Sequence, residues 1–417
     1  MLRILYGTAG TGKSAAIMDE IRRGADSGER YILLVPEQYS HEAERELCAV
    51  CGDGLSLYAE VLSFTGLARE ISSECGGAAN EYLDKGGRLL CMALAADGLY
   101  SRLRVYGAAR RKAELQTMLL GAVDEFKSAC VTSERLLDAA ETCEGALGDK
   151  LHDLGLILEA YDGVVANGRA DPSDRLSVLA QQIGQCSMSE RTHVFVDGFT
   201  DFTAQERRVL EALLSKGVCL TVCLGCDELH GGSEVFALSR ITASALLKFA
   251  ADNGIKAQTE RRDGESTKAK PLGEFCENMF SYRAVEAGDA QGRIKIISAA
   301  DTNAECEFAA AEAVSLVRDT GCRWRDIAVC AKGFDDYRLP LESAFSRFGA
   351  PIYTARKADM LSKPLPMLIE SAYEIILGGW EADDVFDYLR TGFGGLDTDE
   401  CDELENYVFM WQLHGSA

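Results

Sequence analysis

A glycine-rich segment near the start of the chain limits its fold more than any other feature. The segment reads GTAGTGKS and fits the pattern G-x-x-x-x-G-K-[ST] of the phosphate-binding loop. Glycines let the backbone curl so that successive N–H groups point into one concavity, which holds phosphate oxygens together with the following helix N-terminus. The pattern predicts a nucleotide-binding site formed by Gly7, Thr8, Ala9, Gly10, Thr11, Gly12, Lys13 and Ser14.

The residues on both sides of this segment support the same interpretation. Residues 3–6 are typical of a short strand, and residues 15–18 begin a helical pattern. In such a strand–loop–helix unit, Lys13 reaches the terminal phosphates and the Ser14 hydroxyl binds Mg²⁺. We therefore expect an α/β fold with ATP and Mg²⁺ as ligands. The alternative is an ordinary glycine turn with an exposed lysine.

Composition limits the class of protein. The chain has 417 residues, 47% of them hydrophobic and 26% charged, which is enough for two or three soluble domains. No apolar run approaches the length of a membrane span, so we expect no membrane contact and a cytoplasmic protein whose 15 cysteines are reduced. The formal net charge of −23 requires a local basic surface or a basic partner for any nucleic-acid binding. Five scattered histidines argue against a histidine-based hydrolase or a zinc protease.

Hydrophobic periodicity divides the first part of the chain into α/β and helical regions. Residues 1–65 alternate strand and helix patterns, residues 66–189 are almost entirely helical, and the strand pattern returns at Thr192–Val196. We predict that residues 1–65 and 190–255 form one phosphate-loop domain, interrupted by a helical insertion over 66–189.

Beyond residue 255 the pattern weakens before a second α/β region begins. Residues 256–292 are polar and predict a linker. Strand patterns at Ile294–Ser298 and Ile327–Ala331 alternate with helical patterns, which predicts part of a second α/β domain over 293–378. Residues 379–417 are helical and predict the start of a further, truncated insertion.

A second nucleotide-related signal is an apolar strand that ends in an acid. The segment His193–Val196 is followed directly by Asp197. In phosphate-loop proteins, an aspartate at the end of another strand holds Mg²⁺ opposite the Ser or Thr of the loop. Many strands end in aspartate, so the signal is weak alone, but with the loop it predicts Asp197 and Ser14 as the magnesium ligands.

Six segments, spread over most of the chain, follow one another in a familiar order. They are GTAGTGKS, LLVPEQYSHEAERE (33–46), EVLSFTGLARE (60–70), VFVDGFTDFTAQE (194–206), DIAVCAKGFDDYRLPLESAFSRFGAPIYT (326–354) and LRTGFGGLDTDECDELENYV (389–408). Taken in this order, they resemble the N-terminal part of the AddB (RexB-like) family, the B subunits of bacterial AddAB ATP-dependent helicase–nucleases. More distantly, the chain is similar to UvrD-like superfamily 1 helicases.

The resemblance implies a P-loop NTPase (RecA-like) helicase domain with a helical insertion, followed by the start of a second RecA-like domain. It also implies a part in processing double-strand DNA ends for recombinational repair, with an AddA-like helicase–nuclease subunit as partner and mainly single-stranded DNA in contact. The iron–sulfur cysteines and nuclease carboxylates of the family lie further C-terminal, so we expect neither a cluster nor a nuclease site in these residues.

One departure from the resemblance concerns ATP hydrolysis. Related helicases place a glutamate directly after the strand-end aspartate to polarise the attacking water, whereas this chain has Gly198. The expected motor is therefore degenerate, with ATP bound and little hydrolysed. If Asp201 or Glu206 replaces the missing acid, the chain is instead an active translocase. A P-loop small-molecule kinase is a more remote alternative. Arg338 stands where an arginine approaches the γ-phosphate in related motors, with a surface salt bridge as its alternative role.

The resemblance also supplies candidate DNA contacts. Aromatic rings in the DNA-facing segments would stack on bases, and a basic cluster within 102–112 would contact phosphates. For the rings, packing in the core is the alternative, and for the cluster a solvated helix face. The candidates are Ser63, Phe64, Thr65, Phe199, Arg110 and Arg111, with Phe202 as a further aromatic.

Two arrangements of cysteines invite a metal or redox interpretation. Cys48 and Cys51 have no second pair in register, which is typical of structural thiols. The second arrangement comprises Cys219, Cys223, Cys226 and His230, which together have the residue types of a zinc site. Small buried residues of a strand are the simpler interpretation of these cysteines.

Overall fold

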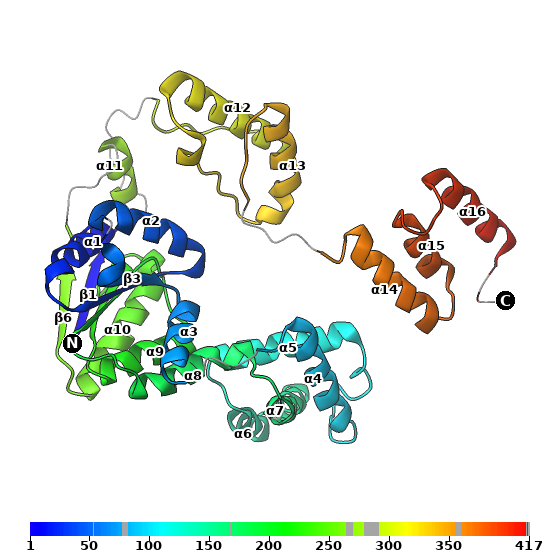
Figure 1. Ribbon diagram of the computed structural model, residues 1–417, viewed down its shortest axis with the longest axis horizontal. Helices are drawn as coiled ribbons and strands as arrows, with labels where there is room; N and C mark the ends of the chain where they lie inside the picture. The colour runs from blue at the N-terminus through cyan, green and yellow to red at the C-terminus, as the bar shows by residue number, and fades with distance from the viewer. Residues whose placement is uncertain are drawn as a thin grey trace. The chain divides into compact units, whose positions relative to one another are not determined.

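The computed structural model describes residues 1–52, 54–76, 82–166, 168–263, 270–278, 292–354, 360–413 and 415. By its internal contacts the chain divides into two compact units, Met1–Lys295 and Ile296–Ala417. Figure 1 shows the secondary structure of both.

The first unit is built on a six-stranded sheet with the strand order β3-β2-β4-β5-β1-β6 (Figure 1). All of its strand pairs are parallel, so the carboxyl ends of the strands meet at one edge. The predicted α/β fold class is thus confirmed. The strands are β1 (Leu2–Gly7), β2 (Arg30–Leu34), β3 (Ala59–Leu62), β4 (Thr192–Val196), β5 (Cys219–Gly225) and β6 (Ala257–Arg261).

Helices cover both faces of the sheet because its central strands are apolar on both sides. One face is covered by α1 (Lys13–Arg23) and α2 (Ser40–Cys51), and Ile17 and Ile21 of α1 pack there with Leu5 of β1. This packing fixes the helix that follows the glycine-rich segment against the strand that precedes it.

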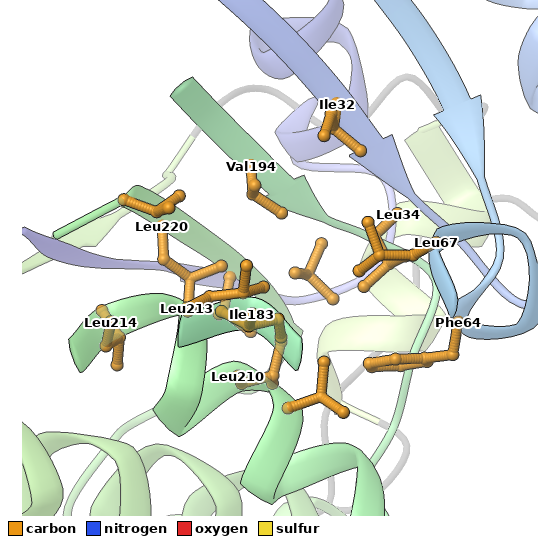
Figure 2. Packing of buried hydrophobic residues seen from close by; sticks show 14 of the residues in the cluster. Ile32, Leu34, Phe64, Leu67, Ile183, Val194, Leu210, Leu213, Leu214 and Leu220 are labelled. Atoms are coloured by element: carbon orange, nitrogen blue, oxygen red, sulfur yellow. The ribbon is translucent and has the colours of Figure 1, made fainter. Parts of the chain in front are cut away.

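The opposite face carries the larger apolar core. Figure 2 shows Leu210 and Leu213 of one covering helix packed toward Val194 of β4, with Phe64 and Leu67 of another nearby. The four helices on this face are α3 (Phe64–Glu74), α8 (Arg175–Gln182), α9 (Ala204–Ser215) and α10 (Ala237–Asp252).

Strand β6 contradicts the prediction that residues 256–292 form only a linker. It pairs with β1 through the Leu2 amide, which donates to the Lys256 carbonyl at 2.9 Å, and the Arg262 amide, which donates to Tyr6 at 2.8 Å. Its residues, AQTER, are mostly polar and largely exposed because it is an edge strand. Backbone pairing, which leaves no hydrophobic pattern, therefore holds it in the sheet. A short helix, α11 (Lys270–Asn278), follows.

Between β3 and β4 in the chain, a second set of helices forms its own apolar core, centred on residues such as Met92 and Tyr161. We call the described residues within 82–174 the helical region. The predicted insertion over 66–189 is too long, because α3 and α8 pack in the core beneath the sheet. The helices of the region are α4 (Lys85–Gly98), α5 (Ala113–Ser128), α6 (Ser133–Thr142) and α7 (Ala146–Val165).

Helices are the only regular secondary structure in the described part of the second unit. The predicted strands Ile294–Ser298 and Ile327–Ala331 are wrong, since within 292–354 these segments have no strand assignment. An extended segment becomes a strand only when a neighbour completes its hydrogen-bond ladder, and the described residues provide none here. The helices are α12 (Thr302–Thr320), α13 (Phe334–Arg347), α14 (Pro364–Leu377), α15 (Ala382–Arg390) and α16 (Thr398–Trp411). No described helix of either unit is both long and apolar enough to cross a membrane.

Candidate nucleotide-binding site

The segment between β1 and α1 has a backbone that its glycines explain. Gly10 and Gly12 have φ angles of 88° and 78°, a left-handed conformation that other residues rarely adopt. Gly7 is enclosed, because a Cβ there would lie 2.7 Å from both the Arg262 carbonyl oxygen and the Thr11 Oγ1. Each of these three positions therefore requires glycine for a physical reason.

The start of α1 is left open to a ligand. Gly12 is its N-cap residue, no side chain caps it, and no acid lies in its first turn. The first N–H groups of a helix lack partners within the helix and carry the positive end of its dipole, so they favour an anion. Ser14 is exposed at this end of the helix.

Lys13 folds back over the loop. Its Nζ donates hydrogen bonds of 2.7 Å to the carbonyl oxygens of Gly7 and Thr8. Burial lowers the pKa of Lys13, while the charges of Cys223 and Asp197 act in the opposite direction. Because its hydrogen-bond partners are backbone carbonyls, an incoming phosphate can replace them without breaking an ion pair.

Asp197 follows β4 at the same edge of the sheet. Its amide donates to the Leu34 carbonyl at 3.0 Å, which continues the pairing with β2. Its Oδ1 accepts the Gly198 amide at 2.9 Å. Carboxylate and hydroxyl oxygens are the ligands that Mg²⁺ prefers, so Asp197 and Ser14 have the chemistry that the predicted metal site needs.

The backbone conformation of Gly198 and its close neighbour both favour glycine at this position. Its φ is 81°, and a Cβ there would lie 3.2 Å from Cδ of Pro36. A glutamate at this position would need a different backbone conformation, so the local structure is built around glycine.

The two acids considered as replacements for the missing glutamate have different environments. Glu206 belongs to a capping box at the start of α9: its Oε2 accepts the Thr203 amide at 2.8 Å and the Thr203 hydroxyl at 3.0 Å. Asp201 is exposed. The T-x-x-E spacing from Thr203 to Glu206 is itself a sequence signal of a helix start, and our sequence interpretation missed it.

The aromatic candidates pack on one another. Phe64 is 5% exposed, and its ring meets those of Phe199 and Phe202 edge to face at 5.5 and 6.2 Å between centroids. The prediction that Phe64 stacks on a base is wrong, because its ring lies in the core beneath the sheet. Phe199 and Phe202 are only partly buried against the same core.

The residues beside Phe64 are more accessible. Ser63 is the N-cap of α3, and its hydroxyl oxygen accepts the Gly66 amide at 3.1 Å. Thr65 is half-buried in the first turn of the same helix. Their contact with DNA stays a prediction.

The basic candidates of the helical region are paired with an acid. Arg110 and Arg111 both contact Asp97, with N–O distances of 3.0 and 3.1 Å, and Arg110 also lies over the Tyr100 ring. The side chain of Arg111 is 75% exposed and that of Arg110 is 17% exposed. Of the two, Arg111 is therefore the one that solvent or a ligand can reach.

Arg338 belongs to α13 in the second unit. It forms an ion pair with Glu342 at 3.4 Å, one helical turn away, while its buried Nε has no hydrogen-bond partner among the described residues. The salt bridge that the sequence left as an alternative is therefore present. A contact of Arg338 with nucleotide stays a prediction.

Two of the cysteines considered for a zinc site are core residues. Cys223 is buried among the residues packed under α1, and Cys226 is fully buried. No group of three or more His, Cys, Asp or Glu residues suited to a metal ion occurs in the part of the chain that the structure describes.

Comparisons with known proteins now place the chain. The family model described as "ADDB, N-terminal" matches residues 4–273. A protein from Acetivibrio thermocellus, named as the B subunit of an ATP-dependent helicase/deoxyribonuclease, is 31% identical over 100% of this chain. Proteins of the same name from Desulforudis audaxviator and Heliobacterium modesticaldum are 33% and 34% identical over 100% and 99% of it.

The chain spans 37% of the length of the relatives from A. thermocellus and D. audaxviator, and 36% of the one from H. modesticaldum. The family model is that of an N-terminal region, and its match includes the glycine-rich segment, β4 and Asp197 within residues 4–273. The chain belongs to the AddB N-terminal family.

Proposed function

We propose that this chain is the N-terminal, helicase-like region of the B subunit of an ATP-dependent helicase/exonuclease that acts in double-strand break repair by homologous recombination. The family membership and the names of the relatives support this role. Because those names describe one subunit of an enzyme, they further support a partner, which we propose is an AddA-like helicase–nuclease in the cytoplasm. Any nuclease site and iron–sulfur cluster would belong to a more C-terminal part.

Within the first unit, the sheet and its covering helices would form the P-loop, RecA-like ATPase domain, and the helical region would be an insertion into it. The division is supported by the two separate apolar cores. Helices α12, α13 and α14 would belong to a second RecA-like domain, and α15 and α16 to a further insertion.

The nucleotide would be held by the loop from Gly7 to Ser14. Its amides and the start of α1 would surround the phosphates, and Lys13 would turn from its carbonyl partners to the terminal phosphates. Asp197 and Ser14 would hold Mg²⁺, which when bound offsets the charge of the phosphates. Single-stranded DNA would contact Ser63, Thr65, Phe199 and Arg111.

The conformation of Gly198 is the observation that carries the proposal of a degenerate motor. Hydrolysis needs a group that positions or activates water, and such a group contributes about 10²–10⁴-fold. Glycine supplies none, and its φ of 81° disfavours any other residue there. We therefore expect ATP to be bound and hydrolysed very slowly.

An active translocase is the second candidate, because Asp201 is exposed in the segment that directly follows the strand-end acid Asp197. Glu206 is a weaker candidate for this role, since it caps α9. A small-molecule kinase would need turnover that depends on a metabolite.

Steady-state phosphate release from ATP, with and without single-stranded DNA, separates these functions. We expect negligible turnover in both conditions alongside calorimetrically detectable ATP binding. Turnover that DNA stimulates and that Asp201→Asn removes would establish the translocase. Stimulation by a small metabolite in place of DNA would establish the kinase, and absence of ATP binding would contradict all three.

A further inference from the structure

Strand β6, which the sequence did not reveal, brings an arginine beside the phosphate loop. β6 lies next to β1 at the edge of the sheet (Figure 1), and Tyr6 is opposite Arg261 in their pairing. The next residue on each strand is Gly7, the first residue of the loop, and Arg262. Neighbouring strands lie about 4.8 Å apart, so Arg262 is one strand spacing away from the start of the loop.

The backbone of Arg262 is part of the loop's support. Its amide donates to the Tyr6 carbonyl at 2.8 Å, and its carbonyl oxygen would lie 2.7 Å from a Cβ at Gly7. On the other side, the Cys226 amide donates to the Gly7 carbonyl at 3.1 Å. Gly7 is held between β5 and β6, which fixes the position of Arg262 relative to the loop.

The side chain of Arg262 belongs to the face of the sheet that α1 covers. Residues opposite each other in a parallel pair share a face and faces alternate along a strand, so Arg262 shares the face of Leu5, which packs with α1. Burial raises the pKa of Cys223, and the positive charges of Lys13, Arg3 and Arg262 all act against that rise. Lys13 of the loop and Arg262 are thus close enough to act on the same buried thiol.

Arg262 is free to change partners. Among the described residues its ion pair is with Glu260 at 3.6 Å, beyond hydrogen-bond distance, and its side chain is 41% exposed. Arg3, on the same face, is instead held by Glu20 at 2.5 Å and by Thr221 at 3.2 Å. Exposed ion pairs such as that of Arg262 contribute little stability, so a ligand can take the guanidinium at small cost.

The strand order determines which end of a nucleotide Arg262 can meet. Asp197 follows β4, on one side of β1, whereas β6 lies on the other side. The terminal phosphate, which shares the metal with Asp197 in the proposed function, then faces β4, and the nucleoside end leaves the loop toward β6. We propose that Arg262 is a further nucleotide-binding residue that contacts the nucleoside end of the bound nucleotide, at the base. This inference rests on the proposed binding of ATP by the loop.

Calorimetric binding of ATP, ADP and inorganic tripolyphosphate tests the assignment, because tripolyphosphate has no nucleoside end. For Arg262→Ala we expect about tenfold weaker binding of ATP and ADP, since a charge-assisted hydrogen bond is lost, and an affinity for tripolyphosphate within about twofold of wild type. Arg261→Ala is the matched control: it removes the neighbouring arginine, which projects from the opposite face and pairs with Glu228 and Asp263. It should leave all three affinities unchanged.

The outcomes separate this inference from the proposed function. Unchanged ATP affinity in Arg262→Ala, or an equal loss for ATP and tripolyphosphate, would overturn the role of Arg262 while leaving nucleotide binding in place. A wild-type chain that binds none of the three ligands would overturn the proposed function itself, and the role of Arg262 with it. Thermal unfolding checks that each variant is folded, and Arg262→Gln repeats the measurement if the alanine variant is not.

Discussion

The glycine-rich edge of the sheet and the helical region each hold a partly or fully buried lysine, but the two lysines have different partners. Lys13 donates to two backbone carbonyls, and burial lowers its pKa. Lys127 is 8% exposed and lies within 3.1 Å of the carboxylates of Asp162, Asp171 and Asp174. Burial acts to lower the pKa of Lys127 as well, but these carboxylates raise it above its usual range. The lysine without fixed carboxylate partners is the one available to a ligand.

The pairing of Lys127 belongs to a larger network that joins three helices to the chain segment leading back to the sheet. Arg88 of α4 contacts Asp124 of α5 and lies 3.1 Å from Asp171, whose side chain is fully buried. Gln205 of α9 extends the network toward the sheet, because its Nε2 donates to the Ser173 carbonyl at 2.8 Å. The charged side chains of this network therefore stabilise the structure, and few of them remain available to bind a ligand.

The largest expected effect tests this structural role. Asp171→Ala should destabilise the chain by about 3–5 kcal/mol, because it leaves buried Lys127 and Arg88 with fewer partners and removes the carboxylate that accepts the Ser173 amide. Chemical denaturation followed by circular dichroism measures the change. Asp149→Ala, which breaks the exposed pair with Arg104, is the control and should cost less than about 1 kcal/mol.

The pH dependence of stability, compared between wild type and Asp171→Ala, gives a second test of the network. Burial alone would raise the pKa of Asp171, but the Ser173 amide and the charges of Lys127 and Arg88 hold it below its usual range. A lowered pKa in the folded state stabilises the fold above the unfolded pKa of about 4, and this contribution is lost as the pH falls further. The stability difference between wild type and Asp171→Ala should therefore shrink below about pH 4. A difference that stays constant to about pH 2 would contradict the network.

At the glycine-rich segment, removal of a charged side chain should weaken nucleotide binding without destabilising the fold. Lys13→Ala should weaken ATP binding by about 10- to 100-fold, because a charged hydrogen-bond donor to the phosphates is lost. Isothermal titration calorimetry measures the affinity, and the exposed Lys85→Ala is the control. Unchanged affinity in a folded Lys13→Ala protein would remove the distinction between the two lysines.

A smaller effect is expected from the backbone at the end of β4. Gly198→Ala should destabilise the fold by about 1–2 kcal/mol, because alanine is strained at a φ of 81° and approaches Pro36. Gly121→Ala, in the middle of α5 with open space around it, should instead be neutral or stabilising by up to about 1 kcal/mol. Gly198→Glu should share the strain and gain no phosphate release, so a clear gain of turnover would contradict the role given to Gly198.

The smallest effect concerns the exposed arginines of the helical region. Arg111→Ala should weaken binding of single-stranded DNA by about twofold at low salt, because Asp97 already offsets much of its charge. Asp97→Ala should strengthen binding by a similar amount by releasing Arg110 and Arg111. Fluorescence anisotropy with a labelled oligonucleotide measures the affinity of both variants. If neither affinity changes, the DNA contact lies on a different surface from this cluster.

Local sequence patterns predicted much of the fold correctly. The central strands are apolar runs, so β2 and β4 and the helices beside them were recognised within a few residues of their observed bounds. The edge strand β6 was not predicted, because polar residues held by backbone hydrogen bonds leave no hydrophobic periodicity in the sequence. The strands predicted in the second unit failed for the converse reason: they have an apolar pattern but no neighbouring strand among the described residues.

The sequence by itself determined the glycine-rich turn, because the left-handed φ angles of Gly10 and Gly12 follow from local sterics and the spacing places Lys13 and Ser14 at the start of α1. Only the tertiary structure decided which side chains are accessible to a ligand. It buried the ring of Phe64, paired Arg110 and Arg111 with Asp97, used Glu206 as a cap and brought Arg262 beside the loop. These outcomes depend on residues far apart in the chain, and the availability of a side chain is set by the neighbours that folding gives it.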